Sequence, residues 1–187
     1  PKEYNFRDGN GIIKPNLMQM LTAYRLIKEK SYGNWSGTGA GKTLSAILAG
    51  RIAGAKNTLI VCNNATIEGW VNSINEYFTN NNIFVKHTLS GDVPKNIYKT
   101  FHKYHINLPS NSNNYLVINY ETFQQDDGEY IVSELLKDNI FDYAIFDEVQ
   151  NVKQRDVDNE SNRRSVIVKL LSQARINNPN ILTLAMT

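Results

Sequence analysis

The sequence has a single cysteine, Cys62, which excludes both a disulfide framework and a zinc site built from cysteines. Its three histidines, His87, His102 and His105, have no cysteine or carboxylate at the spacing of a metal site, so we expect them to have surface or packing roles. No apolar run approaches the roughly 20 residues of a membrane-spanning helix, and no signal peptide opens the sequence. We therefore expect no membrane partner and a reducing compartment.

The length and composition predict one domain. With 187 residues, of which 41% are apolar, the chain is long enough to build an ordinary buried core. We find no internal repeat and no second core, so residues 1–187 are expected to form a single unit. The formal net charge of +2 permits a nucleic-acid partner but does not by itself argue for one.

Short apolar segments alternate with helical patterns, which is typical of a parallel sheet covered by helices. Isoleucine, valine, leucine and phenylalanine fill these segments almost without polar interruption, as expected for strands buried on both faces. The predicted fold class is therefore α/β, with a central, mostly parallel sheet flanked by helices in three layers. The predicted strands are Thr58–Cys62, Phe84–Thr88, Tyr115–Asn119, Tyr143–Asp147 and Ile181–Ala185.

Two helices are predicted from apolar residues at helical spacing. In the first, Leu17–Ile27, we expect Leu17, Leu21, Tyr24 and Ile27 or their neighbours to point inward. In the second, around residues 67–78, Trp70 falls on the apolar face, which favours a place in the core over a base-stacking role.

A glycine-rich segment immediately before another helical run predicts a site for phosphates. It reads Ser36-Gly37-Thr38-Gly39-Ala40-Gly41-Lys42-Thr43. Such a turn aims main-chain N–H groups at one anion, Lys42 supplies a cation for the outer phosphates, and the Thr43 hydroxyl is a ligand for Mg²⁺. Ser36 stands where the strict pattern has glycine. The alternative is a glycine-rich surface loop that happens to carry a lysine.

A pair of carboxylates, Asp147 and Glu148, follows a predicted buried strand. Carboxylates at the carboxyl end of a central parallel strand project into the ligand crevice. We expect Asp147 to bind Mg²⁺ through water and Glu148 to act as the general base that orients the hydrolytic water. The alternative is an acidic pair that ends a strand and begins a helix, where carboxylates are favoured anyway.

Together these motifs resemble motifs I, II and III of superfamily-two helicases, and within that superfamily most resemble the SWI/SNF-type DNA-dependent ATPases. The resemblance covers roughly residues 12 to 187. It rests on the glycine-rich segment at residues 36–43 and on four further segments. These are Thr58–Trp70, Leu116–Phe123, Asp147-Glu148-Val149-Gln150 and Leu184-Ala185-Met186-Thr187. Asn63-Asn64 replaces the usual proline-containing turn, and the stretch that leads into the glycine-rich segment, Ser31–Ser36, is not the usual apolar run.

The resemblance implies an N-terminal, RecA-like, ATP-binding lobe that uses ATP and Mg²⁺. It also implies that Gln19 reads adenine and that Gln150 and Thr187 link the ATP site to the nucleic-acid side. Nucleic-acid backbone, with double-stranded DNA favoured, is expected at two loops. Their candidate residues are Asn63, Asn64 and Thr66 in the first and Tyr120, Glu121 and Thr122 in the second. For each of these residues, simple helix capping is the alternative.

In proteins of this type a second RecA-like lobe supplies an arginine finger, and the sequence stops at motif III. We therefore expect the isolated chain to bind Mg·ATP weakly and to hydrolyse it barely. The expected location is cytoplasmic, in a bacterium or a phage system, or another reducing compartment. Two other functions stay open: the lobe of an RNA helicase, and a P-loop kinase or nucleotide switch that never touches nucleic acid.

Overall fold

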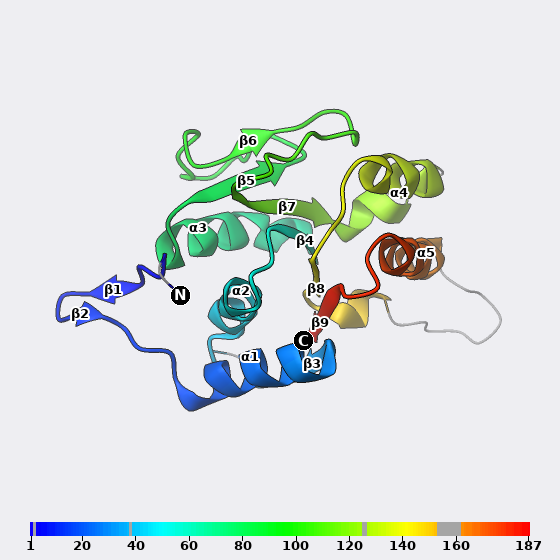
Figure 1. Ribbon diagram of the computed structural model, residues 1–187. Coiled ribbons are helices and arrows are strands. Elements are labelled where there is room, and N and C mark those ends of the chain that lie inside the picture. Colours follow the sequence, from blue (N-terminus) through cyan, green and yellow to red (C-terminus); the bar gives the residue numbers. More distant parts are fainter. Residues whose placement is uncertain (2, 38, 125–126, 153–161) are drawn as a thin grey trace.

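The computed structural model describes residues 1, 3–37, 39–124, 127–152 and 162–187 (Figure 1). These residues form a seven-stranded sheet in the order β3-β9-β8-β4-β7-β5-β6, and neighbouring strands in it run parallel. Its strands are β3 (Ser31–Asn34), β4 (Asn57–Cys62), β5 (Asn81–Val85), β6 (Lys99–Thr100), β7 (Asn113–Asn119), β8 (Tyr143–Phe146) and β9 (Leu182–Met186). A small antiparallel pair, β1 (Arg7–Asp8) and β2 (Gly11–Ile12), precedes them.

Helices cover both faces of the sheet (Figure 1). The strand residues alternate between the two apolar clusters that these helices cover. Within β4, Ile60 belongs to the apolar cluster that α1, α2 and α3 cover, whereas Leu59 and Val61 belong to the cluster under α4 and α5. The helices are α1 (Leu17–Glu29), α2 (Lys42–Ala53), α3 (Ile67–Tyr77), α4 (Gly128–Lys137) and α5 (Asn162–Asn177), with 3₁₀ turns η1 (Asn64–Thr66), η2 (Tyr120–Gln124) and η3 (Val149–Val152). This arrangement confirms the predicted three-layer α/β fold class.

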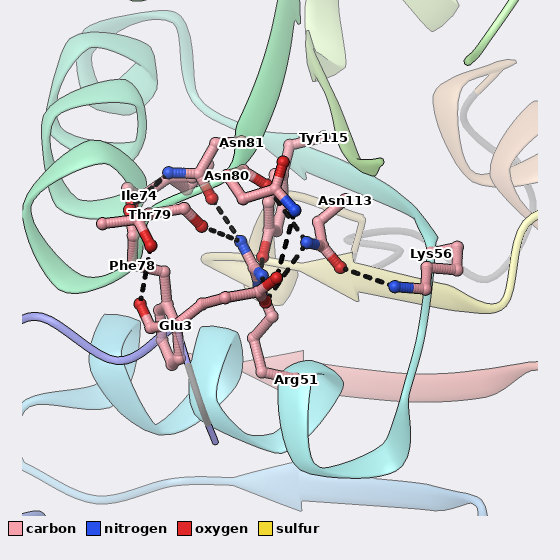
Figure 2. A network of polar contacts seen from close by, with 10 residues as sticks. All are labelled: Glu3, Arg51, Lys56, Ile74, Phe78, Thr79, Asn80, Asn81, Asn113 and Tyr115. Atoms are coloured by element: carbon pink, nitrogen blue, oxygen red, sulfur yellow. Dashed lines mark hydrogen bonds and ion pairs between the residues drawn. The ribbon is translucent and has the colours of Figure 1, made fainter. Parts of the chain in front are cut away.

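A polar network around Arg51 ties the N-terminal segment to the amino ends of the strands (Figure 2). The buried Arg51 side chain on α2 donates from Nε to the Tyr115 hydroxyl at 2.7 Å and from Nη1 to Glu3 Oε2 at 2.5 Å. Nη2 donates to the Thr79 carbonyl at 3.2 Å, and the guanidinium lies 4.9 Å from the Phe78 ring centroid. Because a buried cation needs partners, this cluster joins four segments that are distant in sequence.

The helix predicted at Leu17–Ile27 exists, and its inward face includes neighbours of Leu21, Tyr24 and Ile27, which the prediction allowed, but not those residues themselves. Leu17 and Tyr24 are 75% and 59% exposed, and Leu21 and Ile27 are also exposed. The buried residues of α1 are Gln19, Thr22, Ala23 and Leu26. The buried face of α1, which packs against α2 and β3, carries mostly polar and small residues. The positions of the apolar residues alone therefore do not identify the face that points inward.

Strand predictions from apolar runs are confirmed in the middle of the sheet and are missing or shifted toward its two sides. β3 was not predicted because Ser31–Asn34 has no apolar run, and it lies at the edge of the sheet. β5 begins and ends three residues before the predicted Phe84–Thr88, since Asn81 Nδ2 bonds the Phe78 carbonyl at 2.5 Å and thereby starts the strand with a polar residue.

Cys62 is buried, and this burial raises the pKa of its thiol to about 12. Among the helices of the described ranges, none combines the length and apolarity needed to span a bilayer.

Candidate nucleotide-binding site

The glycine-rich segment forms the turn between β3 and α2. Gly39 and Gly41 have φ values of 79° and 76°, a left-handed conformation that residues with a Cβ rarely adopt. Gly41 is the N-cap of α2, so the helix begins at Lys42 and its free N–H groups face the turn. Ala40 N donates to the Gly37 carbonyl at 3.2 Å within the turn. Thr38, a predicted site residue, lies outside the described residues.

The Lys42 side chain folds back over this turn and contacts its main chain. Its Nζ donates to the main-chain carbonyls of Ser36 at 2.8 Å and Gly37 at 3.1 Å. A pocket of about 680 Å³ opens here, within the size range of small-molecule sites. It is lined by Trp35, Ser36, Gly37, Gly39, Gly41, Lys42, Thr43, Glu148 and Thr187. The structure thus brings the glycine-rich segment and one of the two predicted carboxylates to the same pocket.

Gln19 lies beside the turn. Its side chain closes a capping box at the start of α1, with Oε1 accepting from Asn16 N at 2.8 Å and its own N donating to Asn16 Oδ1 at 2.9 Å. Its Nε2 lies 3.5 Å from the Gly41 carbonyl, and a Cβ at Gly41 would meet this nitrogen at 2.4 Å. Glycine at position 41 therefore allows Gln19 to contact the turn.

Asp147 follows β8, which lies between β9 and β4 in the sheet. Its main-chain N donates to the Val61 carbonyl at 2.9 Å, and its Oδ2 accepts from the Trp70 indole N–H at 2.9 Å. Burial raises the pKa of this carboxyl, while the Trp70 hydrogen bond and, more weakly, the charge of Lys42 lower it. Because β3, β9 and β8 run parallel, Asp147 lies at the same carboxyl edge of the sheet as the glycine-rich turn.

Glu148 has a φ of 53°, a left-handed conformation that costs a residue with a side chain about 1–3 kcal/mol. Strain of this kind is often kept where function requires it. The Glu148 carboxylate accepts from Gln150 Nε2, and Thr187 Oγ1 donates to Gln150 Oε1 at 2.5 Å. A chain of three polar side chains thus runs from the pocket to the end of β9.

The donors near the turn fit Mg²⁺ better than a metal held by the protein alone. No group of three histidine, cysteine, aspartate or glutamate side chains is placed to hold a metal ion in the described part of the chain. Mg²⁺ characteristically takes one or two protein oxygens and completes its shell with water and substrate phosphates. The Thr43 hydroxyl and the Asp147 carboxylate are oxygen donors of that kind.

The two predicted nucleic-acid loops lie side by side, because β4 and β7 are neighbouring parallel strands with Cys62 opposite Asn119. Asn119 Nδ2 donates to Asn64 Oδ1 at 3.3 Å and joins the loops. In the first loop, Thr66 Oγ1 donates to the Asn63 carbonyl at 3.0 Å. A second pocket, of about 450 Å³, opens beside Asn64 and Asn119.

In the second loop, two of the three candidates do not reach the surface. Tyr120 is 0% and Thr122 is 3% exposed, and only Glu121 is exposed. The Tyr120 hydroxyl donates to the Asp147 carbonyl at 2.8 Å, and Thr122 Oγ1 donates to Asn119 Oδ1 at 2.5 Å. Their side chains therefore hold the loop in place instead of offering groups to a ligand, which corrects the expected direct contact.

Two tryptophans near the site were not predicted to take part in it. Trp35 is 61% exposed and lines the pocket, and its ring lies where a Cβ on Gly33 would be. Trp35 directly precedes the glycine-rich segment in the sequence, and this position could have indicated that it lines the pocket. Trp70 is in the core, as predicted, but its N–H reaches Asp147, which periodicity cannot show.

The model of the family described as "Type III restriction enzyme, res subunit" matches residues 12–185. The chain belongs to this family. Among solved structures, that of the UvsW helicase from bacteriophage T4 is similar, with a TM-score of 0.59 and 15% sequence identity over 98% of this chain. This chain covers 55% of that helicase chain. No curated protein matches the sequence.

Membership of the res-subunit family, together with the shared fold, identifies a RecA-like lobe of the superfamily-two helicase type. The resemblance seen in the motifs is thereby confirmed at the level of the superfamily. At 15% identity the T4 helicase supports the fold and no residue roles.

Proposed function

We propose that this res-subunit family member is the ATP-binding lobe of an ATP-dependent nucleic-acid motor, of the DNA translocase or helicase type. The observation that carries the proposal is the pocket in which Lys42 and Thr43 of the glycine-rich turn face Glu148 from the end of β8. A triphosphate is the ligand whose charge suits a lysine, a helix N-terminus and a ring of main-chain N–H groups at once.

In this proposal each side chain has one task. The N–H groups of residues 36–43 and the Lys42 ammonium neutralise the phosphates, and Gln19 contacts adenine beside the turn. Thr43 and, through water, Asp147 hold Mg²⁺, which supplies charge neutralisation for the transferred phosphoryl group. Glu148 accepts the proton of the attacking water, and Gln150 orients the Glu148 carboxylate through the hydrogen bond between them.

Nucleic acid is proposed to lie over the joined loops at the ends of β4 and β7, with double-stranded DNA favoured by the SWI/SNF-type resemblance. Asn63, Asn64 and Thr66 offer polar groups next to the first turn of α3, where free N–H groups suit a phosphate. The exposed Glu121 lies in the second loop, where main-chain groups are the remaining donors. Contacts of this kind hold the backbone and carry no sequence preference.

Stimulation of ATP hydrolysis by nucleic acid tests this function. In the intact protein that carries this lobe, we expect double-stranded DNA of any sequence to stimulate hydrolysis more than single-stranded DNA or RNA. Stronger stimulation by RNA would favour the RNA-helicase alternative, and no stimulation by any of the three would favour a kinase or switch.

The isolated 187-residue chain serves as the companion sample. An arginine finger contributes a factor of about 10³–10⁵ to phosphoryl transfer, and the proposal assigns it to a second lobe. We therefore expect this chain to bind Mg·ATP weakly with barely measurable turnover.

A further inference from the structure

Asp147 is held from two sides by buried aromatic donors. The Trp70 indole N–H donates to its Oδ2 at 2.9 Å, and the Tyr120 hydroxyl donates to its main-chain carbonyl at 2.8 Å. Trp70 is 2% and Tyr120 is 0% exposed. One donor therefore fixes the carboxylate and the other fixes the backbone from which the carboxylate projects.

Each donor belongs to an element that starts at one of the two joined loops. Trp70 lies on α3, which begins directly after η1 (Asn64–Thr66), and Tyr120 is the first residue of η2, directly after Asn119. The loops are bonded to one another through Asn119 and Asn64. A displacement of the loops can therefore move Asp147 through two hydrogen bonds, one from the Trp70 indole and one from the Tyr120 hydroxyl.

A purely packing role explains the burial of the Trp70 ring but not its hydrogen-bond partner. A buried indole N–H or hydroxyl needs an acceptor, and any main-chain carbonyl would serve. Tyr143 shows that simpler case, since its buried hydroxyl on β8 donates to the Ala46 carbonyl at 3.2 Å. Trp70 instead donates to the half-buried carboxylate of Asp147, so loss of its N–H leaves that carboxylate without a fixed orientation.

We propose that Trp70 and Tyr120 are positioning residues that hold Asp147 for Mg²⁺ and transmit a shift of the joined loops to it. The inference rests on the proposed function, because it takes Asp147 as the residue that binds Mg²⁺ through water. Binding of a phosphate backbone at Asn64 then changes the affinity for Mg·ADP. By linkage, Mg·ADP changes the affinity for the duplex by the same factor.

The first test measures ADP binding to the chain by calorimetry at increasing MgCl₂ concentrations. Groups that orient a metal ligand change metal affinity by about 10–100-fold when they are removed. We expect Trp70→Phe to raise the Mg²⁺ concentration for half-maximal binding about tenfold. Tyr120→Phe should raise it less. Tyr143→Phe, which also removes a buried hydroxyl but not one near Asp147, should leave it unchanged.

The second test follows the unsubstituted chain, so it does not depend on any variant folding. In a ¹⁵N–¹H spectrum the Trp70 indole signal is assigned by its absence in Trp70→Phe or, if that variant does not fold, by removal of the Trp35 signal in Trp35→Phe. We expect the Trp70 signal to shift with MgCl₂ and ADP together and also with a 20-base-pair duplex alone. A signal that stays in place under both additions overturns the inference.

Lys42→Ala separates this inference from the proposed function. One outcome is that Lys42→Ala loses Mg·ADP binding while Trp70→Phe and Tyr120→Phe keep the unsubstituted Mg²⁺ dependence. This result would contradict the inference but would be consistent with the proposed function. Unaltered Mg·ADP binding in Lys42→Ala would sink the function itself.

Discussion

Glu148→Gln is expected to slow ATP hydrolysis by the intact protein by a factor of about 10²–10⁴ while Mg·ATP still binds. Glutamine keeps the size of the side chain and can still bond to Gln150, but it cannot accept the proton of the attacking water. Both residues carry a Cβ, so we expect the cost of the left-handed backbone at position 148 to be about the same in the two proteins. The measurement is steady-state hydrolysis with saturating double-stranded DNA, together with calorimetric binding of Mg·ATP.

Glu134→Gln is the matched control. Glu134 lies on α4, where its nearest cation is Lys137 at 4.0 Å, and it is not among the residues that line the pocket. We expect this variant to keep the full rate. Turnover of Glu148→Gln within a factor of about three of the unsubstituted rate would exclude Glu148 as the general base.

Arg51→Leu is expected to lower the free energy of unfolding by about 2–4 kcal/mol, from the polar groups that lose their donor. The substitution leaves the Glu3 carboxylate, the Tyr115 hydroxyl and the Thr79 carbonyl without the donor they share (Figure 2). The Tyr115 hydroxyl is buried and loses its partner without gaining water, whereas the Glu3 side chain is 35% exposed and keeps the donors Asn80 and Asn113. Urea unfolding followed by tryptophan fluorescence measures the change.

The chain offers a matched control in a second arginine–glutamate pair. Arg25 and Glu29 are 2.8 Å apart on one turn of α1, but their side chains are 48% and 41% exposed. Arg25→Leu should therefore leave the urea midpoint almost unchanged. If Arg51→Leu shifted the midpoint no more than Arg25→Leu does, the network would not hold the N-terminal segment to the sheet.

The sequence predicted those parts of the fold that local pattern determines. Central strands such as β4 and β8 are continuous apolar runs, and a glycine-rich turn that ends in a lysine is typical of phosphate binding. Both features can therefore be predicted without tertiary information. The inward face of α1 was not, because it depends on what the helix packs against. Leu17 and Tyr24 are exposed because α1 turns Thr22, Ala23 and Leu26 toward α2 and β3 instead.

The nucleic-acid loops show the same limit. Sequence order placed Asn64 and Tyr120 at the ends of strands, which the structure bears out. Whether such a side chain points outward or into the core depends on the neighbouring strand. Tyr120 turns inward to Asp147, which follows a strand two places away in the sheet, and no periodicity within residues 116–123 carries that information.

Calorimetric titration of Mg·ATP into Lys42→Ala tests most directly whether the glycine-rich turn holds the triphosphate. Loss of a charged hydrogen-bond donor to phosphate weakens binding by about 10- to 100-fold, and that is the predicted result. Lys137→Ala removes an exposed cation on α4 and should bind as the unsubstituted protein does. Equal Mg·ATP affinity in Lys42→Ala, Lys137→Ala and the unsubstituted protein would contradict the account.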